Sequence, residues 1–213
     1  MTTRRVPLVK SPALAQVPDE YESTPFNRIV NTLRLYFNQV DAAFSTLLGT
    51  RGGRILNNPY GAFSNSATQS LAAASTPYVV VLNTTDYGNG VTLASNKMAV
   101  AQDGIYNCQF SLQFENTTAQ IIDAWVWIRK NGADVAGTAS TWAVVASHGG
   151  TNGYAIGACN FFVNLVANDY IELIVAADAT GLNIEAYTNA TLPFVRPSVP
   201  SSVVTLSFVS APT

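Results

Sequence analysis

The sequence predicts a mainly β protein, with a C-terminal antiparallel sandwich preceded by an extended arm and one amphipathic helix. From residue 77 onward, short segments alternate apolar and polar residues with a period of two, and no helical pattern interrupts them. Ahead of them, residues 25–48 repeat apolar residues with a period of seven. The chain of 213 residues is 48% hydrophobic, which suits one ordinary domain with an appendage.

Residues 1–24 are predicted to form an extended arm. Prolines at positions 7, 12 and 18 exclude a continuous helix and favour a polyproline-like path. Apolar residues spaced along this arm, such as Leu8 and Val17, suit anchoring in a surface groove. A floppy tail is the alternative interpretation of the same residues.

The segment 25–48 is predicted to be an anchoring helix. Thr24 is a suitable N-cap, Pro25 fits the first turn and Gly49 fits the position just after the end. The seven-residue repeat is carried by Phe26, Val30, Leu33, Phe37, Val40, Phe44 and Leu47. Such a stripe favours either self-association or docking into a groove of a partner protein, and packing on the chain's own β-domain is the third alternative.

Residues 49–76 are small, polar and glycine-rich, and are predicted to be a linker. The head is predicted to span residues 77–213. Its expected strands lie at 77–82, 97–101, 105–114, 121–132, 140–145, 154–166, 170–177, 182–187 and 203–209. A turn is expected at 86–90, and further turn signals are Asn131-Gly132, Asn168-Asp169 and Thr180-Gly181. Short strands without intervening helices favour an antiparallel sandwich or a jelly roll.

Charge and targeting features exclude several classes of protein. Residues 1–54 carry a net charge of +3 and the remainder −5, but the basic residues are scattered, so no nucleic-acid partner is expected. The prolines near the N-terminus break any signal-peptide core, and no apolar run is long enough to span a membrane. Cys108 and Cys159 alternate in phase with apolar neighbours, which predicts two buried free thiols and no disulfide.

No catalytic, metal or cofactor constellation stands out. His148 is the single histidine, and its His-Gly-Gly context lacks the Gly-x-Ser-x-Gly elbow of an esterase. The acidic residues are dispersed near turns, although carboxylates from separate strands could still meet in the fold. A calcium site at Asp86 or Asp169 lacks clustered oxygen ligands. The protein is therefore not expected to be an enzyme.

Four segments of the head resemble a known family. They are GIY at 104–106, IRKNG at 128–132, LVAND at 165–169 and SVVTLSFV at 202–209. In order and spacing they are similar to C1q/TNF-like jelly-roll heads over roughly residues 77–209. One departure is Asn168, where the family often has glycine, but asparagine tolerates the same left-handed turn. The resemblance implies a homotrimer.

The whole chain, with LRLYFNQVD at 33–41 ahead of such a head, also looks like virion structural proteins of tailed phages. That resemblance implies localisation in the virion and attachment through residues 1–48 to the major capsid protein or to a tail adaptor. Trp125 and Trp127 lie opposite the face of Ala124, Val126 and Ile128, so a second sheet, a loop or a neighbouring subunit must cover one of the two faces. The neighbouring subunit is favoured, which predicts that the two tryptophans are interface residues.

Three functions follow from these features. The first is a trimeric capsid decoration (cement) protein, clamped to the shell by its arm and helix. The second is a short tail-fibre tip that binds a host receptor or glycan, with Tyr87, His148 and Asn152 in candidate receptor-facing loops. The third is a polysaccharide-degrading enzyme. The absence of a long shaft in residues 49–76 favours the first.

Overall fold

The computed structural model describes residues 12–13, 23–48, 58–189 and 194–211. The chain divides into two compact units, with the boundary in the sequence between Asn58 and Pro59, and each is described by itself. Nearly all of the predicted arm lies outside the described residues, as does the glycine expected after the helix.

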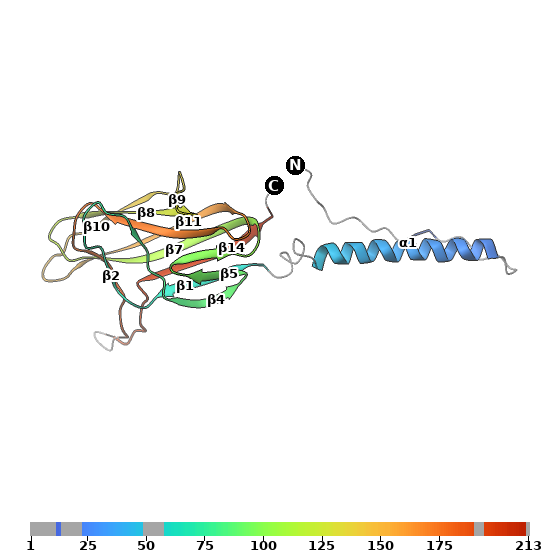
Figure 1. The fold of residues 1–213 in the computed structure, drawn as a ribbon. Coiled ribbons are helices and arrows are strands. Elements are labelled where there is room, and N and C mark those ends of the chain that lie inside the picture. The colour runs from blue at the N-terminus through green and yellow to red at the C-terminus, as the bar shows by residue number, and fades with distance from the viewer. Residues whose placement is uncertain (1–11, 14–22, 49–57, 190–193, 212–213) are drawn as a thin grey trace. The chain divides into compact units, whose positions relative to one another are not determined.

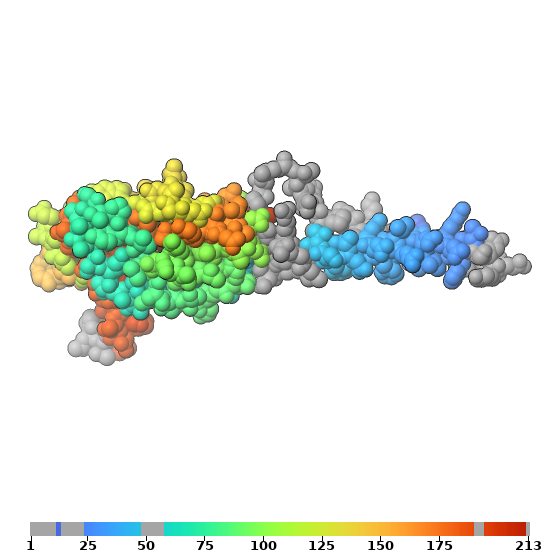
Figure 2. All heavy atoms as spheres, in the orientation of Figure 1, coloured from blue at the N-terminus to red at the C-terminus, as the bar shows by residue number. Residues whose placement is uncertain are grey.

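The first unit contains a single described helix, α1 (Ser23–Leu48), as the heptad pattern predicts. It begins two residues earlier than expected, so Pro25 lies in the first turn, where its missing N–H costs nothing. Figure 2 shows side chains protruding from α1 (blue) at intervals along the helix.

The second unit is a sandwich of two antiparallel sheets, which confirms the predicted fold class (Figure 1). Sheet A has the strand order β4-β1-β14-β7-β11, and β13 and β2 continue it beside the end of β7. Its strands are β1 (Tyr60–Asn65), β2 (Gln69–Ser70), β4 (Thr84–Asn89), β7 (Gly104–Asn116), β11 (Gly153–Leu165), β13 (Leu182–Ile184) and β14 (Ser202–Ser210). A jelly roll fits this order.

Sheet B has the order β10-β8-β12-β6-β5, with β3 paired to β12 and β9 paired to β8. Its strands are β3 (Tyr78–Val79), β5 (Val91–Ala94), β6 (Lys97–Val100), β8 (Ile122–Lys130), β9 (Ala133–Asp134), β10 (Ser140–Val144) and β12 (Tyr170–Ala177). The predicted strand at 77–82 is thus shortened to the two residues of β3.

The core lies between the two sheets, because each long strand turns every second side chain inward. Tyr106, Cys108, Leu112 and Phe114 of β7 are fully buried, as the period of two predicts. At the edge formed by β10 and β11, the Trp142 ring packs against Phe114 with 6.2 Å between ring centroids. This tryptophan partly closes the sandwich where both sheets end.

Residues 59–76 belong to the sandwich, so the predicted linker is wrong over this part. Strand β1 pairs with both β4 and β14, and Phe63 and Leu71 are buried in the core. A side chain at Gly61 would collide with the Phe63 ring, with 2.5 Å between its Cβ and that ring. The small residues that suggested a linker are therefore needed here for close packing.

The predicted turn at 86–90 is also wrong, because most of it lies in β4, the edge strand of sheet A. Two other turn predictions are confirmed. Asn131 and Gly132 have φ of 50° and 83° in the hairpin between β8 and β9, which is typical of a two-residue Asn-Gly turn. Asn168 has φ of 72°, the left-handed geometry that this position requires.

Candidate functional site

The outer face of sheet A carries an exposed row of apolar side chains on β11. Among the described strands it pairs with β7 alone, so it forms the edge of its sheet. Of its outward side chains, Tyr154, Ile156 and Phe162 are 49%, 61% and 65% exposed. Large apolar groups lined up on a sheet edge are typical of a surface that another molecule covers.

At one end of this face, strand register brings polar groups from three strands together. Tyr154 of β11 lies opposite Glu115 of β7, which lies opposite Asn183 of β13. Beside this row, Ile156 faces Gln113, whose backbone oxygen accepts a 2.7 Å hydrogen bond from the Glu185 N–H. Side chains thus form two rows that cross the strands, and directly opposite side chains on paired strands are about 5 Å apart.

The segment between β13 and β14 forms a wall beside these rows. Tyr187 and Val199 exchange backbone hydrogen bonds of 2.9 and 2.8 Å, which hold the two sides of the segment together. In Figures 1 and 2 the described part of this segment projects from the sandwich. The Tyr187 ring meets the Tyr154 ring edge-to-face with 6.2 Å between centroids, and the Arg196 guanidinium lies 5.5 Å from the Tyr187 centroid.

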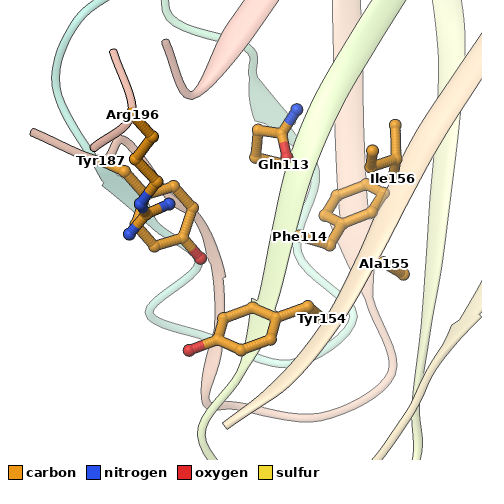
Figure 3. A pocket seen from close by; sticks show the side chains of 7 residues that line it. All are labelled: Gln113, Phe114, Tyr154, Ala155, Ile156, Tyr187 and Arg196. Carbon is orange, nitrogen blue, oxygen red and sulfur yellow. The ribbon is translucent and has the colours of Figure 1, made fainter. Parts of the chain in front are cut away.

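The wall and the sheet enclose a hollow of about 490 Å³, shown in Figure 3. We call it the tyrosine hollow; it is lined by Gln113, Phe114, Tyr154, Ala155, Ile156, Tyr187 and Arg196. A second hollow, of about 460 Å³, lies by the same segment, is also lined by Tyr187, and includes Ser64 and Asp86 in its lining.

Two carboxylates give the surroundings of the tyrosine hollow a negative charge. Burial, together with the neighbouring carboxylate of Glu115, raises the pKa of Glu185 despite a hydrogen bond with Thr68. Burial, and then Tyr154, Glu115 and Glu185, raise the pKa of Tyr187 well above its usual range. The Tyr187 hydroxyl therefore stays protonated near neutral pH and can donate a hydrogen bond.

The predicted anchor residues on α1 form a partly exposed stripe. Phe26, Val30, Phe37 and Phe44 are 54%, 44%, 57% and 57% exposed, whereas Leu33, Val40 and Leu47 are half-buried. The stripe is thus a surface feature of the first unit over much of its length.

The two tryptophans considered for a subunit interface, Trp125 and Trp127, lie on the outer face of sheet B. Val126 and Ile128 point into the core and are fully buried, whereas Trp125 and Trp127 are half-buried. Trp127 donates a 2.8 Å hydrogen bond from its Nε1 to Asp134, the last residue of β9. That bond, and then one from Arg129, lower the pKa of Asp134. The chain's own hairpin therefore contributes to the surroundings of Trp127.

The candidate loop residues do not form one surface. Tyr87 is 71% exposed but lies within β4, and His148 lies in an exposed turn closed by a bridge to Thr151. The Asn152 side chain instead donates a 2.9 Å hydrogen bond to Glu115 Oε1, so it supports the carboxylate beside the tyrosine hollow. The prediction that Cys159 is buried is wrong, since it is half-buried at the edge of its sheet.

Sequence patterns missed most of the tyrosine hollow. Tyr187 and Arg196 come from a segment without periodicity, and Glu115 looked like one of many dispersed acids. The alternation of 154–166 did place Tyr154 and Ile156 on one strand face, which is the one signal that pointed here.

Among the described residues, no three His, Cys, Asp or Glu side chains are grouped so that they could hold a metal ion. Asp169 is engaged instead with Lys130, Asn131 and the Val166 N–H. No helix in the described part of the chain is both long and apolar enough to cross a membrane. A comparison of the sequence with models of protein families found no match, and a comparison with curated proteins found none.

Proposed function

We propose that the protein is a structural component of a phage virion, a trimeric capsid decoration protein attached to the shell through residues 1–48. The resemblance to C1q/TNF-like heads and to tailed-phage structural proteins suggests this role. The exposed apolar stripe of α1 supports it. A helix of 26 residues that leaves Phe37 and Phe44 more than half exposed has an apolar face suited to burial on another protein.

The trimeric head of this proposal is supported by a second apolar surface. Phe162 on β11 and Val166 just after it are 65% and 56% exposed. They lie at the end of sheet A where β7 begins, since Phe162 is opposite Asn107. Exposed aromatic and aliphatic side chains of this kind are typical of the centre of a subunit interface.

Copy number in purified particles tests the location. Quantitative mass spectrometry against the major shell protein should give hundreds of copies per particle. A few dozen copies or fewer would instead favour a short tail-fibre tip, for which the exposed tyrosine hollow is a candidate receptor site. Absence from particles would contradict both virion roles.

Paired substitutions test the two surfaces separately. Phe37→Asp should abolish attachment to particles, whereas Leu35→Asp should not, because Leu35 is equally exposed (63%) but lies off the stripe. Phe162→Asp should convert the head fragment Pro59–Thr213 from trimer to monomer in analytical ultracentrifugation. The matched control is Tyr87→Asp, at a 71% exposed aromatic on β4. A wild-type head fragment that is monomeric would show that the head does not drive trimerisation.

A further inference from the structure

The tyrosine hollow has the size and shape of a small-molecule site. Its volume of about 490 Å³ lies within the range of roughly 300–1,000 Å³ found for ligand pockets. Its floor comes from β7 and β11, and its wall comes from the segment that Tyr187 and Val199 close by two backbone hydrogen bonds. The wall is joined to the floor by the 2.7 Å hydrogen bond from the Glu185 N–H to the Gln113 backbone oxygen.

Two aromatic rings give the hollow its apolar surface. Tyr154 is 49% exposed and stands edge-to-face with Tyr187, so the two rings border the space at an angle, as Figure 3 shows. Ile156 adds an aliphatic group beside them. A pyranose ring presents C–H groups on its faces, and aromatic rings with polar tips suit such amphipathic partners.

The polar groups around the rings match the hydroxyls at the edge of a sugar. Gln113 offers an amide that both donates and accepts, and the hydroxyls of Tyr154 and Tyr187 do the same. Arg196, whose guanidinium lies 5.5 Å from the Tyr187 ring centroid, adds further donors. Each of these groups can exchange hydrogen bonds with neutral hydroxyls, and none requires a charged ligand.

The charges nearby select against acidic ligands. Glu115 lies directly opposite Tyr154, and Glu185 lies beside Gln113. Arg196 is the single cationic side chain that lines the hollow among the described residues. Both carboxylates are close enough to raise the pKa of Tyr187, so the negative charge of an anionic sugar bound beside that ring would be repelled.

From this geometry we propose that the tyrosine hollow binds a neutral hexopyranose unit of a glycan. The site differs from the positions of Tyr87 on β4 and His148 in its turn, and it does not depend on whether the protein sits on a capsid or a tail. It would give the head an affinity for surface polysaccharides in addition to any structural role.

A printed array of bacterial polysaccharides and oligosaccharides, probed with the full-length protein, tests the proposal. We expect binding to neutral hexose-containing glycans and little binding to uronate- or sialate-rich ones. The strongest neutral oligosaccharide on the array would then be titrated by isothermal calorimetry. Gln113→Ala and Tyr154→Ala should each weaken its binding about tenfold, the scale of one lost hydrogen bond or ring contact.

Two controls keep the result interpretable. Tyr60→Ala removes a similarly exposed tyrosine of β1 (45%) outside the hollow and should bind as the wild type does. Tyr154→Phe keeps the ring and the fold, so a smaller loss than in Tyr154→Ala would separate stacking from hydrogen bonding. The proposal is overturned if no neutral glycan binds, if anionic glycans bind more strongly, or if the hollow variants, shown by circular dichroism to be folded, bind normally.

Discussion

Lys130 and Asp169 form an ion pair with 2.7 Å between Nζ and Oδ2, which ties the end of β8 to the turn before β12. Asp169 is buried, and it also accepts hydrogen bonds from the Asn131 side chain at 2.7 Å and the Val166 N–H at 2.8 Å. One carboxylate therefore fixes two turns that lie far apart in the sequence.

Replacing this carboxylate should destabilise the sandwich. Asp169→Ala removes an acceptor shared by three donors, of which Lys130 keeps its bond to the Asn164 carbonyl, and we expect the free energy of unfolding to fall by about 2–3 kcal/mol. Chemical denaturation measured by circular dichroism would check this. The control is Asp86→Ala, at an exposed acid that accepts a 3.1 Å hydrogen bond from the Ser64 hydroxyl, which should change stability by less than about 0.5 kcal/mol. Equal effects of the two substitutions would contradict the network.

The contribution of Asp169 should depend on pH. Burial by itself would raise its pKa, but the hydrogen bonds from Lys130, Val166 and Asn131 outweigh burial and lower it. A carboxyl whose folded pKa is lowered stabilises the fold above its unfolded pKa of about 3.9 and loses that effect as pH falls below it. The stability difference between wild type and Asp169→Asn should therefore shrink below about pH 4.

The left-handed backbone of Asn168 gives a second test. With φ of 72°, the position suits asparagine or glycine and disfavours a β-branched residue. Asn168→Val should lower the free energy of unfolding by about 1–2 kcal/mol, whereas Asn168→Gly should be close to wild type. A stable valine variant would mean that the turn relaxes without cost.

Local chemistry of this kind is what the sequence predicted best. Asn131-Gly132 and Asn168 act within their own turns, and the alternation of β7 and β8 placed Cys108 and Val126 in the core. Strand β1 was missed because Phe63 is its one large buried apolar residue, and its pairing with β4 and β14 depends on segments distant in the sequence.

The tyrosine hollow was missed for the same physical reason. Its residues come from β7, from β11 and from a segment without periodicity, so only the register of the sheet and the Tyr187–Val199 bridge bring them together. Periodicity assigns a side chain to a strand face, but it does not say which strand will be its neighbour.

Glu185 should affect stability with the opposite sign to Asp169. Burial and the nearby Glu115 raise its pKa, so its charged form is disfavoured in the folded state. This destabilisation is present above the folded pKa and is absent below the unfolded value of about 4.3. Glu185→Gln should therefore raise the thermal midpoint at pH 7, and the gain should vanish near pH 4. A gain that persists at low pH would contradict this electrostatic origin.

The two free thiols should differ sharply in reactivity. Cys108 is fully buried, and burial raises its pKa to about 12, so almost no thiolate exists at pH 8. Cys159 is half-buried, with its Sγ 3.8 Å from the Ser140 hydroxyl at the edge between β10 and β11. Labelling of the native protein with a thiol-reactive disulfide reagent should therefore modify one thiol per chain, and unfolding should expose the second. The Cys159→Ser variant should show no labelling until it unfolds; labelling of this variant at the wild-type rate would mean that Cys108 is reached through opening of the sandwich.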